Sequence, residues 1–197
     1  MNNKAKQLLK LIGFPVYVLY RKVVKLYGRK NPIGAADYRY YRAFKKHIDW
    51  NNPRDLNEKI NWLKFHEDPY VWARLSDKYA VREFVKDHGL GHILIPLYGI
   101  WDSVDDMAHD WDSLPEEFIL KSNNGSGNVI KIEGRKRENI KDILPVVEKW
   151  ICEKNYGEDT LELHYKLINN KIMAEQLLKS TYAFSKSPID YKGELQK

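Results

Sequence analysis

The sequence contains a single cysteine, Cys152, among its 197 residues. One thiol excludes an internal disulfide framework and a cysteine-rich zinc module, and it suits a reducing compartment. No apolar run reaches the roughly 18 residues that a transmembrane helix needs. The 11 glycines and 8 prolines follow no period, which excludes collagen-like and low-complexity chains. These absences leave a globular protein that is long enough to bury a core.

Acidic residues are absent from the first 36 positions, since the first one is Asp37. The same stretch carries eight basic residues: Lys4, Lys6, Lys10, Arg21, Lys22, Lys25, Arg29 and Lys30. The rest of the chain then holds 25 basic and 27 acidic residues, a net charge of −2, against +6 for the whole. The positive charge therefore belongs to the N-terminal arm, and we expect no nucleic-acid-binding face on the body.

The arm is also apolar between its charges, most of all from Leu11 to Tyr20. That run is too short to span a bilayer, and Pro15 disturbs a helix there. Two interpretations stay open. Residues 1–30 form a basic amphipathic segment on the anionic inner face of the membrane, or they form a helix that packs on the body with its lysines in water. Either way the protein is expected in the cytoplasm.

Helical and strand patterns mix along the rest of the chain without regular alternation. Apolar spacing predicts helices over residues 55–66, 76–89 and 138–154, the second capped by Ser76. Short apolar runs predict strands over residues 93–95, 97–101, 118–121, 128–132 and 172–175. Residues 161–167 are ambiguous. The irregular order favours an α+β fold over a doubly wound sheet.

Three short motifs could contact a nucleotide. A strand carries Lys121 into the loop Asn123-Asn-Gly-Ser-Gly127, whose backbone N–H groups could approach phosphate oxygens. A simple hairpin with an Asn-Gly turn explains the same residues. Glu175 ends an apolar strand, where its carboxylate could accept hydrogen bonds from two ribose hydroxyls. An ordinary strand end is the alternative.

The third motif places Lys78 in the first turn of its helix, where the helix dipole disfavours a cation. A nearby anion would explain a lysine at that position, and Arg82 lies on the same helical face. A solvated helix with an aspartate cap explains it equally well. The acidic residues between 102 and 112, with His109 among them, are expected to form a solvated helix face rather than a cation site. Cys152 is expected to be a packing residue.

The order of these motifs resembles the first half of an ATP-grasp enzyme, and most closely the TupA-like type of teichuronopeptide biosynthesis. The likeness runs through residues 53–64, 77–82, 114–115, 118–127, 174–175 and 190–192. It implies an ATP-grasp-like α+β domain preceded by the basic helical arm. The domains expected on this basis are the arm at 1–36, a linker at 37–52 and a partial ATP-grasp-like domain at 53–197.

The resemblance also implies roles for individual residues. Lys78 and Lys121 would contact the phosphates of ATP, and Glu175 would bind the ribose. Gly125, Ser126 and Gly127 would form a lid over the phosphates. Gln176 and Leu177 would line the adenine through their backbone. Asn123 is also expected to contact the cofactor. Enzymes of this superfamily use ATP to join a carboxylate to a nucleophile, usually an amine.

The family carries its Mg²⁺ ligands in a half that follows the hinge, and this chain ends at Lys197. We therefore expect a C-terminally truncated, catalytically incomplete protein without Mg²⁺ ligands. Ile172 and Leu177 should then face solvent and favour self-association. The expected function is that of an ATP-dependent carboxylate–amine ligase in bacterial surface-polysaccharide or teichuronopeptide biosynthesis. The alternative is a non-catalytic membrane-associated scaffold, or a polysaccharide-biosynthesis protein that works beside a glycosyltransferase.

Overall fold

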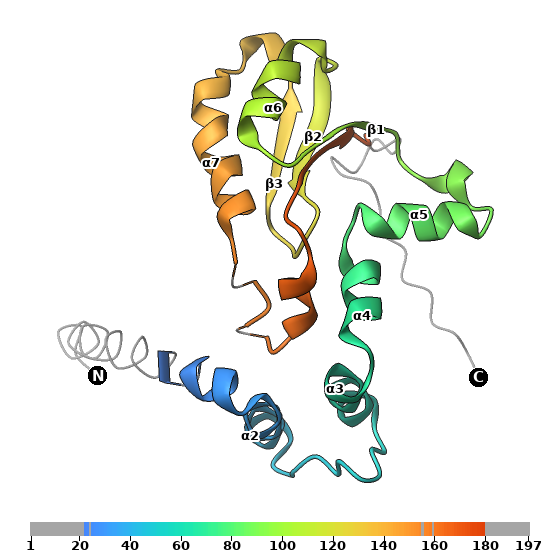
Figure 1. Cartoon of the computed structure of the whole chain (residues 1–197), viewed down its shortest axis with the longest axis vertical. Coiled ribbons are helices and arrows are strands. Elements are labelled where there is room, and N and C mark those ends of the chain that lie inside the picture. The colour runs from blue at the N-terminus through green and yellow to red at the C-terminus, as the bar shows by residue number, and fades with distance from the viewer. Residues whose placement is uncertain (1–21, 24, 155, 159, 180–197) are drawn as a thin grey trace, which may run out of the picture. The chain divides into compact units, whose positions relative to one another are not determined.

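The structure, a computed structural model, describes residues 22, 23, 25–154, 156–158 and 160–179 (Figure 1). The chain divides into two compact units, Met1–Ser76 with Lys154–Asn169, and Asp77–Glu153 with Asn170–Lys197. The predicted arm boundary at residue 36 lies inside a helix, α2, which spans Pro32–Phe44. Within the described residues, no helix is long and apolar enough to cross a membrane.

The first unit is helical. Residues 25–30 form one helical segment, and the other elements are α2, α3 (Leu56–His66), α4 (Pro69–Ser76) and the 3-10 helix η4 (Leu163–Leu167). The predicted helix over 55–66 is confirmed by α3. Asp68-Pro69, a pair that is typical of turns in sequence, here opens α4, because proline suits the first position of a helix. Ser76 ends α4, so its predicted role as an N-cap was wrong.

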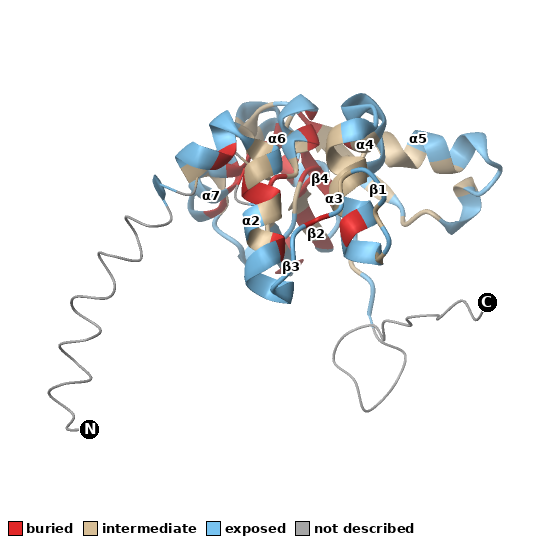
Figure 2. Ribbon diagram, turned by 90° about the horizontal axis from the view of Figure 1, so that it is seen from below, coloured by how far each residue is buried: buried red, intermediate tan, exposed pale blue. Residues whose placement is uncertain are grey.

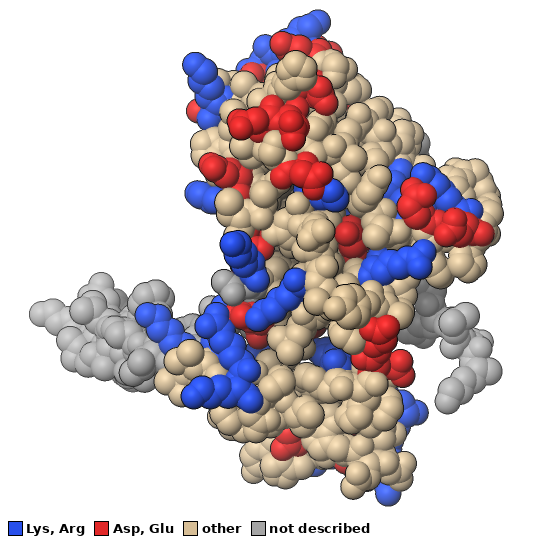
Figure 3. Space-filling model, viewed as in Figure 1, with Lys and Arg blue, Asp and Glu red and all other residues tan. Residues whose placement is uncertain are grey.

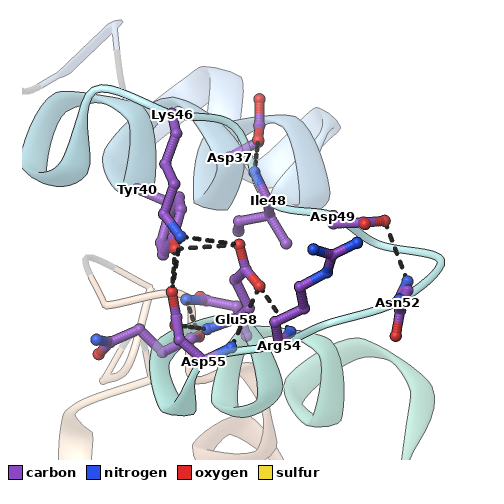
Figure 4. A network of polar contacts seen from close by, with 11 residues as sticks. Asp37, Tyr40, Lys46, Ile48, Asp49, Asn52, Arg54, Asp55 and Glu58 are labelled. Carbon is purple, nitrogen blue, oxygen red and sulfur yellow. Dashed lines mark hydrogen bonds and ion pairs between the residues drawn. The ribbon is translucent and has the colours of Figure 1, made fainter.

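A polar network joins α2 to the start of α3 (Figure 4). Asp55 and Glu58 form a capping box, in which the Asp55 side chain accepts from the Glu58 backbone N–H. Glu58 is only 3% exposed, and its Oε2 accepts from the Arg54 N–H at 2.7 Å. The Tyr40 hydroxyl donates to Asp55 Oδ2 at 2.6 Å, and Lys46 Nζ lies 3.0 Å from that oxygen. These hydrogen bonds lower the pKa values of both carboxyl groups.

A second cluster ties the helical segment 25–30 to the returning chain. Glu158 is 5% exposed and receives Arg29 Nη2 at 2.8 Å, Lys25 Nζ at 3.3 Å and Lys166 Nζ at 2.6 Å. The hydrogen bonds from Arg29, Lys166 and Lys25 lower the pKa of Glu158 to about 2, although burial acts in the opposite direction. Three cations thus share one buried carboxylate.

The second unit is a four-stranded sheet with helices. Its elements are α5 (Ala80–Asp87), η1 (Gly91–Ile93), β1 (Leu97–Trp101), α6 (Val104–Asp110), η2 (Trp111–Ser113), β2 (Glu117–Ser122), β3 (Val129–Glu133), η3 (Arg135–Arg137), α7 (Ile140–Cys152) and β4 (Ile172–Gln176). The α+β class is confirmed. The strand predicted over 93–95 was wrong, because the Leu94 N–H bonds to the Gly91 carbonyl in a 3-10 turn.

The strands lie in the order β1-β4-β2-β3, and each adjacent pair is antiparallel. The last strand, β4, therefore enters between β1 and β2. Phe118 faces Gln176 at one end of β2, and Ser122 faces Ile172 at the other. Because side chains alternate between the faces of a strand, one face of β2 carries Phe118 and Leu120 and the other carries Ile119 and Lys121.

Helices α6 and α7 cover the first of these faces (Figure 1). In the second unit, buried residues, drawn in red, lie on β2 and β4 and on the helices packed against them (Figure 2). The core includes Phe118, Leu120 and Ile172, each fully buried. The expectation that Ile172 faces solvent was therefore wrong, because α7 covers it from within the same unit. Cys152 is exposed, so its predicted packing role was also wrong.

Acidic side chains gather over α6 (Figure 3). The side chain of Ser103 caps this helix by accepting from the Asp106 N–H. In the part of the chain that the structure describes, no group of three or more His, Cys, Asp or Glu side chains could hold a metal ion. Asp105 and Asp106 of this helix are exposed, and Asp110 accepts a hydrogen bond from Trp101 Nε1 at 2.8 Å.

We predict that Glu158→Gln lowers the stability of the folded protein at neutral pH by about 1–3 kcal/mol, because three cations lose their shared negative charge. Since the folded-state pKa of Glu158 is about 2, against about 4.3 in an unfolded chain, its contribution is complete above about pH 5 and is lost as the pH falls towards 2. Thermal melts over this range should show a smaller pH dependence in the variant.

Glu138→Gln serves as the control, because Glu138 is exposed. Equal pH dependence of the melting temperature in the wild type and in Glu158→Gln would contradict the stabilising role of Glu158.

Candidate functional site

The face of the sheet opposite α6 and α7 is partly open and carries two of the predicted residues. Lys121 lies beside Met173 and Val129 in the strand register. Glu175 lies beside Ile119 in the next row. Val129 is 54% exposed on the outer strand. Ile119, Lys121 and Val129 thus stay accessible on this face, whereas Met173 and Glu175 are buried beneath it. The accessible side chains form a surface on which a flat, partly polar molecule could lie.

Glu175 joins cations from two elements. Its Oε1 accepts from Arg82 Nη1 of α5 at 3.1 Å, and its Oε2 is ion-paired with Lys121 Nζ of β2. Arg82 also donates from Nη2 to the Ile95 carbonyl at 2.6 Å. Glu175 is 5% exposed, so both of its oxygens are held inside the fold. A ribose hydroxyl would have to share these oxygens with the two cations.

Lys78 adds a third cation to this group. Its ammonium donates to the carbonyls of Asn124 at 3.1 Å and Gly125 at 2.5 Å. Its backbone N–H bonds to the Asn123 carbonyl at 2.8 Å. Burial lowers the pKa of Lys78, and the charge of Lys121 lowers it further. The lysine is thus bound to the glycine-rich loop, within electrostatic reach of Lys121.

Lys78 precedes α5 rather than lying in its first turn, so the predicted placement was wrong. Asp77 also precedes α5, and its carboxylate accepts from the N–H groups of Tyr79, which is next to the helix, and of Ala80, which begins it. The Lys78 side chain is directed away from the start of the helix, at the glycine-rich loop.

The loop between β2 and β3 needs glycine at two positions. Gly125 has φ of 57° and Gly127 of 91°, values that disfavour residues with a Cβ. No atom lies within 4 Å of a Cβ built on Gly127, and both Ser126 and Gly127 are exposed. The predicted hairpin is confirmed by the antiparallel β2–β3 ladder. The tip of this hairpin loop therefore has a left-handed backbone conformation, and the space around Gly127 is open.

Buried asparagines fasten the base of the loop to the chain that enters β4. Asn123 is fully buried, and its Oδ1 accepts from the Lys171 N–H at 2.7 Å. Its own N–H bonds to the Lys171 carbonyl at 3.1 Å. These two hydrogen bonds extend the β2–β4 pairing by one residue beyond Ser122 and fix the point at which the loop leaves the sheet.

Asn124 connects the loop to α7. Its Nδ2 donates to Asn170 Oδ1 at 2.6 Å, and Asn170 Nδ2 lies within 3.1 Å of three carbonyls at the end of α7: Trp150, Ile151 and Glu153. Carbonyls only accept hydrogen bonds, so Asn170 must present its NH₂ to the helix and its oxygen to Asn124. Asn124 Oδ1 is then a buried acceptor without a hydrogen-bond partner among the residues that the structure describes.

The other end of the sheet holds the two predicted hinge residues. The Gln176 N–H bonds to the Pro96 carbonyl at 3.0 Å. Gln176 and Leu177 line a cavity of about 540 Å³ together with Tyr98, Pro115, Glu116, Glu117, Glu133, Gly134 and Arg137. This cavity is acidic, and it lies at the end of β2 that is farther from the glycine loop.

The structure thus brings the side chains of Lys78, Lys121 and Glu175 within reach of one another. Gln176 and Leu177 follow Glu175 directly in the chain, and Gln176 pairs with Phe118 at the end of β2 that is farther from the glycine-rich loop. Sequence reasoning missed the contacts of Asn124 and Asn170. The pair Asn169-Asn170 is typical of a turn, but it gives no sign of these contacts. The described residues do not fit a Mg²⁺ site, since they contain no cluster of potential ligands.

Comparison with known proteins identifies one family. A family model described as TupA-like ATPgrasp matches residues 58–192, more than half of the chain. No curated protein and no solved structure gives a match. The match confirms the resemblance that the ordered motifs indicate, and it contains Lys78, the glycine-rich loop and Glu175.

We predict that Asn124 and Asn170 act as one unit that orders the loop. Asn170→Ala should cost about 1–3 kcal/mol of stability, because it leaves buried polar groups without partners. Asn124→Ala should cost less in the Asn170→Ala background than in the wild type, since the shared hydrogen bond is already gone. Urea unfolding of the two single variants and the double variant measures this coupling, and strictly additive losses would contradict it.

Proposed function

The chain belongs to the TupA-like ATP-grasp family, and from this premise we propose that it binds ATP on the open face of its sheet. The triphosphate would lie under the loop of residues 123–127, beside Lys78 and Lys121. The adenine would lie at the other end of the strands, against the backbone of Gln176 and Leu177. The family as a whole uses ATP and Mg²⁺.

The observation that carries the proposal is the concentration of positive charge beside the glycine-rich loop. Lys78, Arg82 and Lys121 are held together around Glu175, and each has a fixed partner. Asp77 and Glu175 are the carboxylates that act on Lys78, so the cations outnumber these acidic groups by one. An added phosphate would meet cations that are already positioned, which lowers the entropic cost of binding.

The spacing along the strands supports the same placement. Gln176 pairs with Phe118, and the loop begins after Ser122. Four residues of strand separate the two points, about 13 Å at roughly 3.3 Å per residue. This length suits an extended nucleoside triphosphate whose base and terminal phosphate contact opposite ends of the sheet.

ATP supplies a phosphoryl group that activates a carboxylate when it is bound to enzymes of this superfamily. In this chain, Lys121 would orient the phosphates from the floor of the site. Lys78 would exchange the carbonyls of Asn124 and Gly125 for phosphate oxygens, a stronger charge-assisted contact. Ser126 and Gly127 would cover the phosphates from above and exclude water, because their exposed tip has room to move.

We further propose a substrate class. Carboxylate–amine ligation in the synthesis of a bacterial surface polysaccharide or teichuronopeptide is the role that the TupA-like description favours. Sugar acids and acidic amino acids both supply carboxylates for such a ligation. The support for this role is the family alone.

Isothermal titration calorimetry with ATP and Mg²⁺ tests the ATP site. We expect saturable binding of the wild type, weakened about tenfold or more in Lys121→Ala, because one charge-assisted contact to phosphate is worth about 1.5–3 kcal/mol. Lys78→Ala should weaken binding to a similar degree.

The matched control is Lys131→Ala. Lys131 faces the same side of the sheet from the outer strand β3, is ion-paired with Glu133, and lies beside Ile119 rather than in the cluster. Its removal should leave the affinity unchanged. Absence of ATP binding at millimolar concentration, or an equal loss in Lys131→Ala and Lys121→Ala, would contradict the proposed site.

A further inference from the structure

The helical segment before α2 has two unlike faces. Residues 22, 23 and 25–30 are helical, and a helix turns by about 100° per residue. At this spacing five side chains fall within one arc of about 140°, and all are exposed: Lys22, Val23, Leu26, Tyr27 and Lys30. We call this arc the outer face.

The rest of the helix circumference carries residues that contact the protein. Lys25 and Arg29 are ion-paired with Glu158. Gly28 between them is buried, and a Cβ at its position would lie 3.1 Å from Leu161 Cδ2. The absence of a side chain at Gly28 therefore lets the helix lie close against residues 158–161. The outer face must then point away from this contact.

The outer face is apolar where a water-exposed helix is usually polar. Val23 is 55% exposed, Leu26 58% and Tyr27 46%, and along the helix axis they lie between Lys22 and Lys30. Lys22 and Lys30 carry long apolar stems that can lie along such a surface with the ammonium groups at its border. Basic side chains gather around this helix in Figure 3.

We propose that the outer face binds the surface of an anionic membrane. Charge complementarity favours this occupant, since no acidic residue precedes Asp37 and eight basic residues do. An interfacial helix buries its apolar residues at the level of the headgroups and keeps its lysines near the lipid phosphates. Glu158 neutralises Lys25 and Arg29 on the other side of the helix, and these ion pairs fix the helix to the protein. The first unit would thus be attached to the membrane through a helix that remains docked on it.

Sedimentation of the full-length chain with vesicles tests this proposal. With vesicles of equal parts phosphatidylcholine and phosphatidylserine we expect binding that is lost in pure phosphatidylcholine and weakened by salt. Leu26→Glu should weaken it at least tenfold, because it places a charge among the buried apolar groups. Lys22→Gln and Lys30→Gln should each weaken it about fivefold, the effect of one basic residue near an anionic surface.

Leu56→Glu is the matched control. Leu56 is a 70% exposed leucine in the same unit, and it begins α3, where an acidic residue is tolerated. This variant should bind vesicles like the wild type. Unchanged binding of Leu26→Glu, or equal losses in Leu26→Glu and Leu56→Glu, would overturn the proposal. A third outcome would also overturn it: the wild type binds neither kind of vesicle and instead forms dimers that Leu26→Glu dissociates.

Discussion

Two cations, Lys121 and Arg82, share the carboxylate of Glu175 at the end of the central strand β4. The ion pairs connect β2, α5 and β4, three elements that are far apart in sequence. A carboxylate that is 5% exposed would be costly to bury alone, and removal of either cation would leave part of that cost uncompensated. We therefore regard Glu175 as the residue that positions the cations of the ATP site.

The loop above these cations depends on polar side chains from the chain segment that enters β4. Asn123 pairs with the backbone of Lys171, and Asn124 reaches the end of α7 through Asn170. The base of the loop is therefore held firmly, whereas Ser126 and Gly127 at its tip are exposed. A lid that closes over phosphates needs this combination of a fixed base and a movable tip. The buried Asn124 Oδ1 has no hydrogen-bond partner within the described part of the chain, so it is available to the loop backbone when the tip moves.

The sequence predicted the parts of the site whose chemistry is local. Gly125 and Gly127 mark a turn wherever they occur, and Lys121 and Glu175 are polar residues at the ends of apolar strands. Their convergence follows from the insertion of β4 between β1 and β2, a long-range pairing that no local pattern encodes. Asn170 and Glu158 were missed for the same reason, because their partners lie 19 and 129 residues away. The prediction placed a cap at Ser76, one residue too early. The side chain that accepts from the N–H groups at the start of α5 is that of the next residue, Asp77.

Hydrogen exchange of the backbone amides, with and without ATP and Mg²⁺, tests the central claim most directly, since it reports where the nucleotide lies. The account predicts slower exchange in residues 123–128 and 175–177 when ATP is present. Exchange in the middle of α7 and in residues 25–30 should stay unchanged and serve as the internal reference. Protection by ATP that avoids the loop and the end of β4, or that appears in the first unit alone, would contradict a nucleotide site built around Glu175.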